Sequence, residues 1–203
     1  MGWIFSFWFV IIQLSNSLEK TLIIGFSGPK GCGKDKAFEI IKRNYPDLKV
    51  KKIAFADPIR KKLFEIFNLN ENSYDNLKRS ENVTILGSTA VISRVDGREI
   101  VRGIGMLMRS YDEDQFVNYV RKEVLTHPDT IYICTDVRFE NEVEMFKEMG
   151  CPIALIKREG YHYDNHVSER PISHYDELIV NDSLEKFEKR VIEFFDDFVV
   201  KKQ

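Results

Sequence analysis

The chain has 203 residues, of which 43% are hydrophobic, a length and composition sufficient for one well-buried core. Thirty Lys plus Arg against 32 Asp plus Glu leave a formal charge of -2 at pH 7, which argues against a protein that coats nucleic-acid polymers. Its three cysteines, Cys32, Cys134 and Cys151, have no CxxC spacing, so they predict neither a disulfide framework nor a zinc site and fit a reducing, cytosolic compartment.

The N-terminus is apolar over residues 3–14, apart from Ser6 and Gln13. This run is shorter than the roughly 20 residues that a helix needs to cross a bilayer. No Lys or Arg precedes it and no small-x-small cleavage site is clear, which argues against a secretory signal. We expect residues 1–19 to be an extension outside the folded core, without firm membrane association; a hydrophobic partner contact is an alternative.

Strands and helices alternate from residue 20 onward. Residues 21–27 (TLIIGFS) are β-branched and apolar, as in a strand buried on both faces. Residues 34–44 carry apolar side chains at helical spacing, and Pro46 marks the end of this helix. Residues 50–55 predict a second strand, and Pro58 stands where a second helix begins.

The segment 68–96 is polar and predicts mostly loop, with a hairpin near residues 85–95. Beyond it the alternation resumes, with one further segment, 158–176, that is polar. The predicted elements in order are helices at 97–110 and 113–126, a strand at 130–135, a helix at 140–149 stopped by Gly150, strands at 152–157 and 177–180, and a last helix opening with capping-box spacing at 182–185.

Repeated strand–helix units of this kind predict an α/β fold. The sheet is expected to be mainly parallel, with five strands, helices on both faces and right-handed crossovers, which makes a three-layer sandwich. We expect residues 20–203 to form a single domain, with a helical insertion at 68–127 and a lid at 158–176.

The strongest chemical signal is the run from Gly28 to Asp35, GPKGCGKD, which matches GxxxxGK with Asp35 where Ser or Thr is usual. Glycines let successive backbone N–H groups turn toward phosphate oxygens, and the following helix directs its positive end at the same anion. Lys34 would reach the β- and γ-phosphates. The motif predicts nucleotide binding and a P-loop NTPase-like fold. The predicted ATP-binding residues are Gly28, Lys30, Gly31, Cys32, Gly33, Lys34, Asp35 and Lys36.

Asp35 is also the candidate metal ligand. A hydroxyl at this position normally binds Mg²⁺, and a carboxylate is an equally hard oxygen ligand. The alternative is an acidic residue stabilised by the helix dipole.

Several segments in sequence order carry a family resemblance: GPKGCGKD, FADPIRKKL, GREIVRGIG, TDVRFENE and DNHVSE. Together they resemble the bacteriophage-type deoxynucleoside monophosphate kinases, from about residue 22 to the last helix. The resemblance implies that ATP and Mg²⁺ are used to convert deoxynucleoside monophosphates into diphosphates in the cytoplasm, that of the host if the source is viral. The family usually has Thr where Lys36 stands and Trp where Phe116 stands.

An arginine stripe on the predicted helix 97–110 fits the acceptor half of such a site. Arg98, Arg102, Gly105 and Arg109 fall at i, i+4, i+7 and i+11, which places them on one face. Guanidinium groups bind phosphate bidentately, and a glycine lets a ligand approach closely. A solvated basic face is the alternative. The resemblance favours Arg98, Gly105 and Arg109 as acceptor-binding residues and leaves Arg102 open.

Polar residues also follow two predicted strands at their carboxyl ends, where ligands bind in parallel sheets. The resemblance implies that Asp136, Arg138 and Glu142 contact the acceptor; the alternative is a capped helix with an Asp–Arg pair. Asp57 either contacts the acceptor or caps the helix that begins at Pro58.

The polar segment 158–176 has the composition of a lid that carries cations to the transferred phosphoryl group. By analogy Arg158 joins Lys34 and Arg138 in the predicted catalytic set. His166 and Glu169 match the family pattern H-x-S-E and are expected at the acceptor site.

Three functional hypotheses remain from the sequence. The first is the deoxynucleoside monophosphate kinase, the second a P-loop kinase of another phosphorylated metabolite, and the third a non-catalytic nucleotide-binding regulatory module. Residues 181–182 either contact the adenine or cap the last helix, and the sequence leaves the base preference and a homodimer open.

Overall fold

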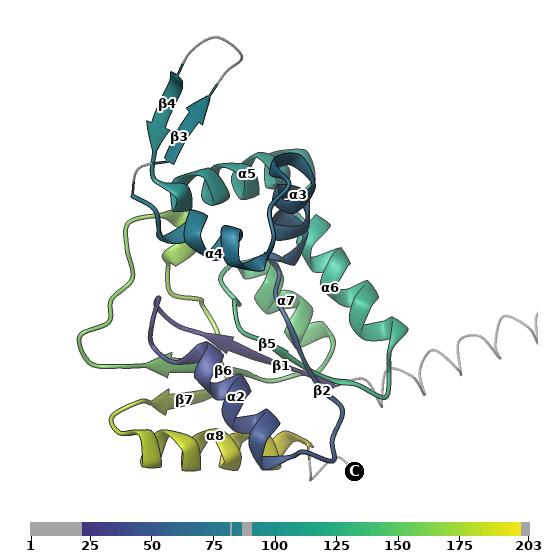
Figure 1. Cartoon of the computed structure of the whole chain (residues 1–203). Coiled ribbons are helices and arrows are strands. Elements are labelled where there is room, and N and C mark those ends of the chain that lie inside the picture. Colours follow the sequence, from purple (N-terminus) through teal and green to yellow (C-terminus); the bar gives the residue numbers. More distant parts are fainter. Residues whose placement is uncertain (1–21, 82, 87–90, 200–203) are drawn as a thin grey trace, which may run out of the picture. The chain divides into compact units, whose positions relative to one another are not determined.

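The structure is a computed structural model that describes residues 22–81, 83–86 and 91–199 (Figure 1). The predicted N-terminal extension, 1–19, lies outside this part. The chain divides into two compact units, one joining the residues up to Phe55 to those from Val120 onward, and one spanning Ala56–Tyr119. The helical insertion was predicted at 68–127. The second unit begins 12 residues earlier, at Ala56, and ends eight residues earlier, at Tyr119. Across the described ranges, no helix is both long and apolar enough to cross a bilayer.

The first unit is built on a five-stranded sheet in which every neighbouring pair is parallel. This confirms the predicted α/β fold. Its strand order is β2-β5-β1-β6-β7. The strands are β1 (Leu22–Ser27), β2 (Val50–Ile53), β5 (Ile131–Cys134), β6 (Ile153–Lys157) and β7 (Glu177–Val180).

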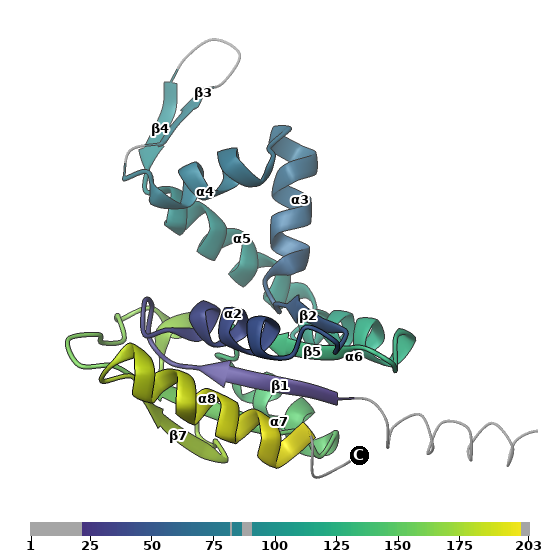
Figure 2. The same cartoon turned by 60° about the horizontal axis from the view of Figure 1, so that its bottom comes forward.

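The central strand β1 is covered on both faces by helices (Figure 2). This explains why the run LIIGFS carries apolar side chains on both faces. On one face, Ile24 and Phe26 pack into a core with α2 (Lys34–Asn44) and α8 (Leu184–Val199). On the other face, a Cβ atom at Gly25 would lie 2.9 Å from the ring of Phe146 in α7 (Glu140–Glu148). The result is the predicted three-layer sandwich.

The last helix begins later than its capping-box spacing predicted. The helix α8 starts at Leu184, and Ser183 Oγ accepts the hydrogen bond from Lys186 N at 3.3 Å. Asp182 was therefore wrongly predicted to open the helix. Its carboxylate instead accepts hydrogen bonds from Lys186 and Arg190 on the surface.

Over its described residues, the second unit contains three helices, a two-stranded antiparallel hairpin and the first residues of α6 (Gln115–Thr126). The hairpin confirms the prediction near residues 85–95. The three helices are α3 (Asp57–Phe67), α4 (Glu71–Arg79) and α5 (Gly97–Tyr111), and the strands are β3 (Val83–Leu86) and β4 (Val91–Val95).

The helix α4 was not predicted: its segment was expected to be mostly loop. Only Tyr74 is buried in α4, so the helix has no apolar stripe to read. Its start is stabilised by a reciprocal cap, in which Ser73 N donates to Asn70 Oδ1 at 2.9 Å and Asn70 N donates to Ser73 Oγ at 2.7 Å. The end of α4 meets the start of α5, where a Cβ atom at Gly97 would lie only 1.8 Å from the carbonyl oxygen of Leu77.

Candidate active site

The loop between β1 and α2, residues 28–33, has the backbone that its glycines predict. Gly28, Gly31 and Gly33 have φ angles of 136°, 79° and 123°, a region that other residues rarely adopt. A Cβ atom at Gly28 would lie 2.4 Å from the carbonyl oxygen of Ile156 in β6. Conformation and space therefore both require glycine here, and the loop runs into the amino end of α2 as a phosphate site does. We call residues 28–35 the phosphate loop.

Lys34, the first residue of α2, turns its side chain back into this loop. Its Nζ donates to the carbonyl oxygens of Gly28 at 2.5 Å and Pro29 at 2.8 Å. Burial lowers the pKa of Lys34; the nearby Cys32 opposes this change, and Arg138 adds to it. The amine is thus held inside the loop, within the electrostatic reach of a second cation.

Asn181 fixes the loop from the end of β7. Its Nδ2 donates to the carbonyl oxygen of Cys32 at 2.7 Å, and it lies close to Gly33, where a Cβ atom would be 2.7 Å from that same nitrogen. The sequence suggested only adenine contact or capping for residues 181–182, so this contact was missed. No local spacing signals it, because the two partners are 149 positions apart in the chain.

The segment after β6 lies on the phosphate loop. Arg158 Nη1 donates to the carbonyl oxygen of Gly31 at 3.4 Å, and its guanidinium carbon lies 4.7 Å from the centre of the Tyr161 ring. A Cβ atom at Gly31 would lie 2.6 Å from that ring. The structure thus brings the predicted catalytic Arg158 to the loop. Lys30, in the same loop, has an exposed side chain.

Arg138 follows β5 and is held by the H-x-S-E segment. Its Nη1 donates to the carbonyl oxygen of Ser168 at 2.9 Å and to the buried carboxylate of Glu169 at 2.5 Å. Burial works against the charged form of Arg138, but the Glu169 carboxylate outweighs it and raises the pKa. His166 Nδ1 accepts from Ser168 N at 3.1 Å, which closes the short helix η1 (Val167–Glu169). In this structure, His166 and Glu169 therefore position Arg138.

The two carboxylates that flank Arg138 in sequence hold backbone N–H groups. Glu142 is buried, and its Oε2 accepts from Arg138 N at 2.8 Å and from Phe139 N at 3.1 Å. Asp136 Oδ1 accepts from Phe55 N at 2.8 Å. This geometry matches the capped-helix alternative for Glu142, with Glu169 as the ion-pair partner of Arg138.

Asp35 was the candidate metal ligand, and its surroundings suit a hard cation. Its Oδ1 accepts from Lys52 Nζ at 2.6 Å. Burial opposes its ionisation, but Lys52, the Thr135 hydroxyl and Lys34 outweigh it and lower the pKa of Asp35. An ionised carboxylate beside a hydroxyl offers the oxygen ligands that Mg²⁺ accepts together with phosphates and water, so the residues fit the ion. Lys36, the neighbour of Asp35, pairs with Glu39 on the surface at 2.9 Å.

The other predicted acceptor residues lie in the second unit. Asp57 is the first residue of α3, and its carboxylate pairs with Arg60 at 3.0 Å. The N-cap residue of α3 is Ala56, so the prediction that Asp57 caps this helix was wrong. Gly105 is buried, and a Cβ atom there would lie 2.9 Å from Ile59 Cδ1. Arg109 stacks over the buried Phe116 ring at 4.6 Å.

The predicted helix at 97–110 is confirmed as α5, and helical spacing places its arginines at 98, 102 and 109 on one face. In it, Arg102 pairs with Glu99 at 2.8 Å, and Arg98 N donates to the Asp96 cap at 2.7 Å.

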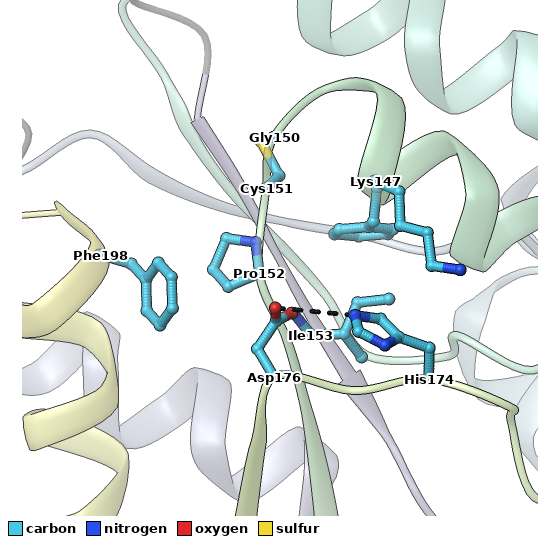
Figure 3. A pocket seen from close by; sticks show the side chains of 9 residues that line it. Lys147, Gly150, Cys151, Pro152, Ile153, His174, Asp176 and Phe198 are labelled. Carbon is cyan, nitrogen blue, oxygen red and sulfur yellow. Dashed lines mark hydrogen bonds and ion pairs between the residues drawn. The ribbon is translucent and has the colours of Figure 1, made fainter.

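A pocket of about 280 Å³ lies elsewhere in the first unit. Figure 3 shows Pro152, His174 and Asp176 around it. Ile153, the first residue of β6, also lines the pocket. It therefore opens at the amino end of a strand, whereas the phosphate loop and Arg138 follow the carboxyl ends of β1 and β5. Ligands of parallel sheets bind at the carboxyl ends, so we do not assign this pocket to the active site.

Comparison with known proteins gives one relative by sequence. No family model matches the chain. A protein of Acanthamoeba polyphaga mimivirus named "Putative deoxynucleotide monophosphate kinase" is 29% identical over 198 residues, covering 87% of this chain and 97% of that protein. The resemblance that the motif order predicted is confirmed by this match.

Two solved structures of the APS kinase of Mycobacterium tuberculosis are also similar to this chain. One, a cysteine-to-alanine variant, is 11% identical with a TM-score of 0.41, covering 87% of this chain and 97% of that chain. The other, in complex with AMPPNP and APS, is 10% identical with a TM-score of 0.43, covering 86% of this chain and 95% of that chain.

Proposed function

We propose that the chain is a P-loop kinase that transfers the γ-phosphoryl group of ATP to the phosphate of a deoxynucleoside monophosphate. The observation that carries this proposal is the phosphate loop at the carboxyl end of β1, in which Gly28, Gly31 and Gly33 have positive φ angles and Lys34 Nζ turns back to the carbonyl oxygens of Gly28 and Pro29. A lysine held among backbone groups at the start of a helix is placed to bind phosphate oxygens. The deoxynucleotide as substrate is supported by the motif resemblance and by the name of the mimivirus relative.

The phosphate loop would bind the donor's polyphosphate. Its positive-φ glycines orient backbone N–H groups, and the amino end of α2 adds a favourable dipole. Lys34 exchanges its bonds to the Gly28 and Pro29 carbonyls for phosphate oxygens. Asp35, with Thr135 beside it, would hold Mg²⁺, which supplies positive charge to the phosphates when it is bound.

Transfer needs no general base from this chain. The attacking phosphate oxygen of the acceptor is already ionised at pH 7, so catalysis consists of positioning and charge stabilisation. Arg138, oriented by Glu169, and Arg158, which contacts the phosphate loop, would stabilise the charge on the transferred group. Asp57, Arg98, Gly105 and Arg109 of the second unit are the proposed acceptor-binding residues, as the resemblance implies.

A coupled ADP-release assay on the full chain tests the proposal. The substrates are the four common deoxynucleoside monophosphates, their ribose counterparts and a panel of phosphorylated metabolites, each with ATP and Mg²⁺. We expect turnover with at least one deoxynucleoside monophosphate. Turnover of another phosphate ester alone would identify a different P-loop kinase, and binding of Mg·ATP without any turnover would favour the regulatory module.

A further inference from the structure

Tyr163, in the segment that lies on the phosphate loop, has a buried hydroxyl. Within the described ranges, no protein group forms a hydrogen bond with its Oη. Leaving a buried hydroxyl unpaired is unfavourable, and most such groups in folded proteins find a partner. The function described so far gives this hydroxyl no role.

The neighbours of the hydroxyl place it beside the candidate active site. Burial raises the pKa of Tyr163 to about 12, with further contributions from Cys32 and Glu169, while Arg138 opposes them. Cys32 belongs to the phosphate loop, and Glu169 is the partner of Arg138. Two residues before Tyr163, the Tyr161 ring packs on Gly31 and anchors the segment to the same loop.

Lys34 has the same three neighbours. Its Nζ lies 3.7 Å from Cys32 Sγ, and Arg138, which is bound to the Glu169 carboxylate, interacts electrostatically with both Lys34 and Tyr163, so the amine, the guanidinium and the phenol share one region of the first unit. At neutral pH the phenol keeps its proton and can donate it. A region that offers an ammonium, a guanidinium and an O–H donor is complementary to a ligand group with only acceptors, and phosphate is such a group.

We propose that Tyr163 Oη donates a hydrogen bond to a phosphate oxygen of the nucleotide bound at the phosphate loop. This inference rests on the proposed function, since it adds one contact to the same site. It explains why a buried donor has no protein acceptor: its partner arrives with the ligand. Tyr163 then contributes to affinity for the polyphosphate, and the hydroxyl is unfavourable only in the unliganded protein.

The test compares three full-length proteins: the wild type, Tyr163→Phe and Tyr175→Phe. Tyr175 is a partly exposed tyrosine of the same segment and serves as the matched control. Calorimetry measures the binding of AMPPNP with Mg²⁺, and of inorganic tripolyphosphate, which carries no base or sugar. A thermal melt of each unliganded protein gives its Tm.

We expect Tyr163→Phe to bind both probes about 5- to 30-fold more weakly, while its Tm without ligand is equal to or above that of the wild type. Tyr175→Phe should bind as the wild type does. A purely structural tyrosine would give the opposite pattern, with a lower Tm and unchanged affinity.

Two results would overturn this inference while leaving the proposed function intact. One is equal affinity of the wild type and Tyr163→Phe for the two probes. The other is a lower Tm of unliganded Tyr163→Phe than of the wild type, which would reveal a hydrogen-bond partner within the protein. If the wild type bound neither probe, the proposed function would fall together with this contact. Binding without kinase turnover would overturn the reaction and leave the role of Tyr163 to be judged on affinity.

Discussion

The side-chain amide of Asn181 donates a 2.7 Å hydrogen bond to the carbonyl oxygen of Cys32, 149 positions earlier in the chain. The bond joins the end of β7 to the middle of the phosphate loop. Since that carbonyl accepts from Asn181, the loop is held in a fixed conformation before a ligand binds, which lowers the entropy lost on binding.

The substitution Asn181→Asp tests this contact. It keeps the size of the side chain but replaces the donor with a carboxylate that faces a carbonyl oxygen of the proposed phosphate site. We expect the dissociation constant for Mg·ATP to rise about tenfold or more, measured by calorimetry. The matched control is Asn44→Asp, because Asn44 Nδ2 donates to the Ile40 carbonyl within its own helix. Equal weakening in both variants would contradict a specific role for Asn181.

Lys34→Ala should lower kcat about 100- to 1,000-fold, as expected when a charge-stabilising donor is removed from a transition state. The folded structure should persist, because burial already disfavours the charged amine. Initial rates and far-ultraviolet circular dichroism check the two statements. Lys42→Ala is the control, since Lys42 lies on the same helix with its ammonium 5.9 Å from the Phe38 ring. Retained turnover in Lys34→Ala would disprove the assignment.

Glu142 should matter for stability. Replacing it with Ala leaves the N–H groups of Arg138 and Phe139 without their carboxylate acceptor, so the free energy of unfolding should fall by about 2–4 kcal/mol. Glu142→Gln keeps an acceptor oxygen and should lose less. Glu144→Ala, whose exposed side chain lies 3.8 Å from Lys147, should change stability by no more than about 0.5 kcal/mol.

Urea denaturation provides these three free energies. If Glu142→Ala were as stable as the wild type but bound the acceptor less well, Glu142 would be a ligand contact.

The ion pair between Asp35 and Lys52 predicts a pH effect. The pKa of Asp35 lies below its ordinary value of 3.8, so its contribution to stability is present above pH 3.8 and is lost as the pH falls through the folded-state pKa. Removing the ammonium with Lys52→Met should move the Asp35 titration back up toward 3.8, as followed by NMR of the carboxyl carbon. Lys51→Met, which removes the neighbouring partner of Glu123, should leave it unchanged. A titration that does not differ between the two variants would exclude this pairing in solution.

Two glycines on α5 form a matched pair for testing what Gly105 does. A Cβ atom at Gly103 would meet nothing within 4 Å, so Gly103→Ala should stabilise the helix by about 0.5–1 kcal/mol. At Gly105 the same methyl group would lie 2.9 Å from Ile59 Cδ1, and moving that side chain should cancel most of this gain. Thermal denaturation separates the two. If Gly105→Ala loses acceptor affinity without losing stability, the glycine is needed for the ligand rather than for packing.

Most of the sheet unit could be predicted because its signals are local. The strand β1 is apolar on both faces, and α2 places its buried residues at helical spacing. The helix α4 escaped because it buries only Tyr74, and its start depends on a reciprocal cap between Asn70 and Ser73. Polar helices of this kind resemble loops in sequence, since no apolar face distinguishes them.

In the candidate site, too, local motifs could be predicted and contacts between distant residues could not. The phosphate loop is a continuous motif whose glycine spacing dictates its backbone, so sequence alone indicated its position. The partners that orient it and its neighbours come from elsewhere: Asn181 reaches Cys32, and Glu169 reaches Arg138 from 31 residues away. Pairings across such distances depend on the packing of the sheet, and one sequence does not encode them in any spacing.

The strand order also bears on how the chain is made. Ser27 Oγ at the end of β1 donates to the carbonyl oxygen of Val137, 110 residues later, and both neighbours of β1 in the sheet follow it at a comparable distance. On the ribosome, β1 therefore emerges long before it has a strand to pair with, while its apolar faces lie open to association with other chains. The nascent protein should acquire the ability to bind a nucleotide late in translation, only after β6 has left the exit tunnel.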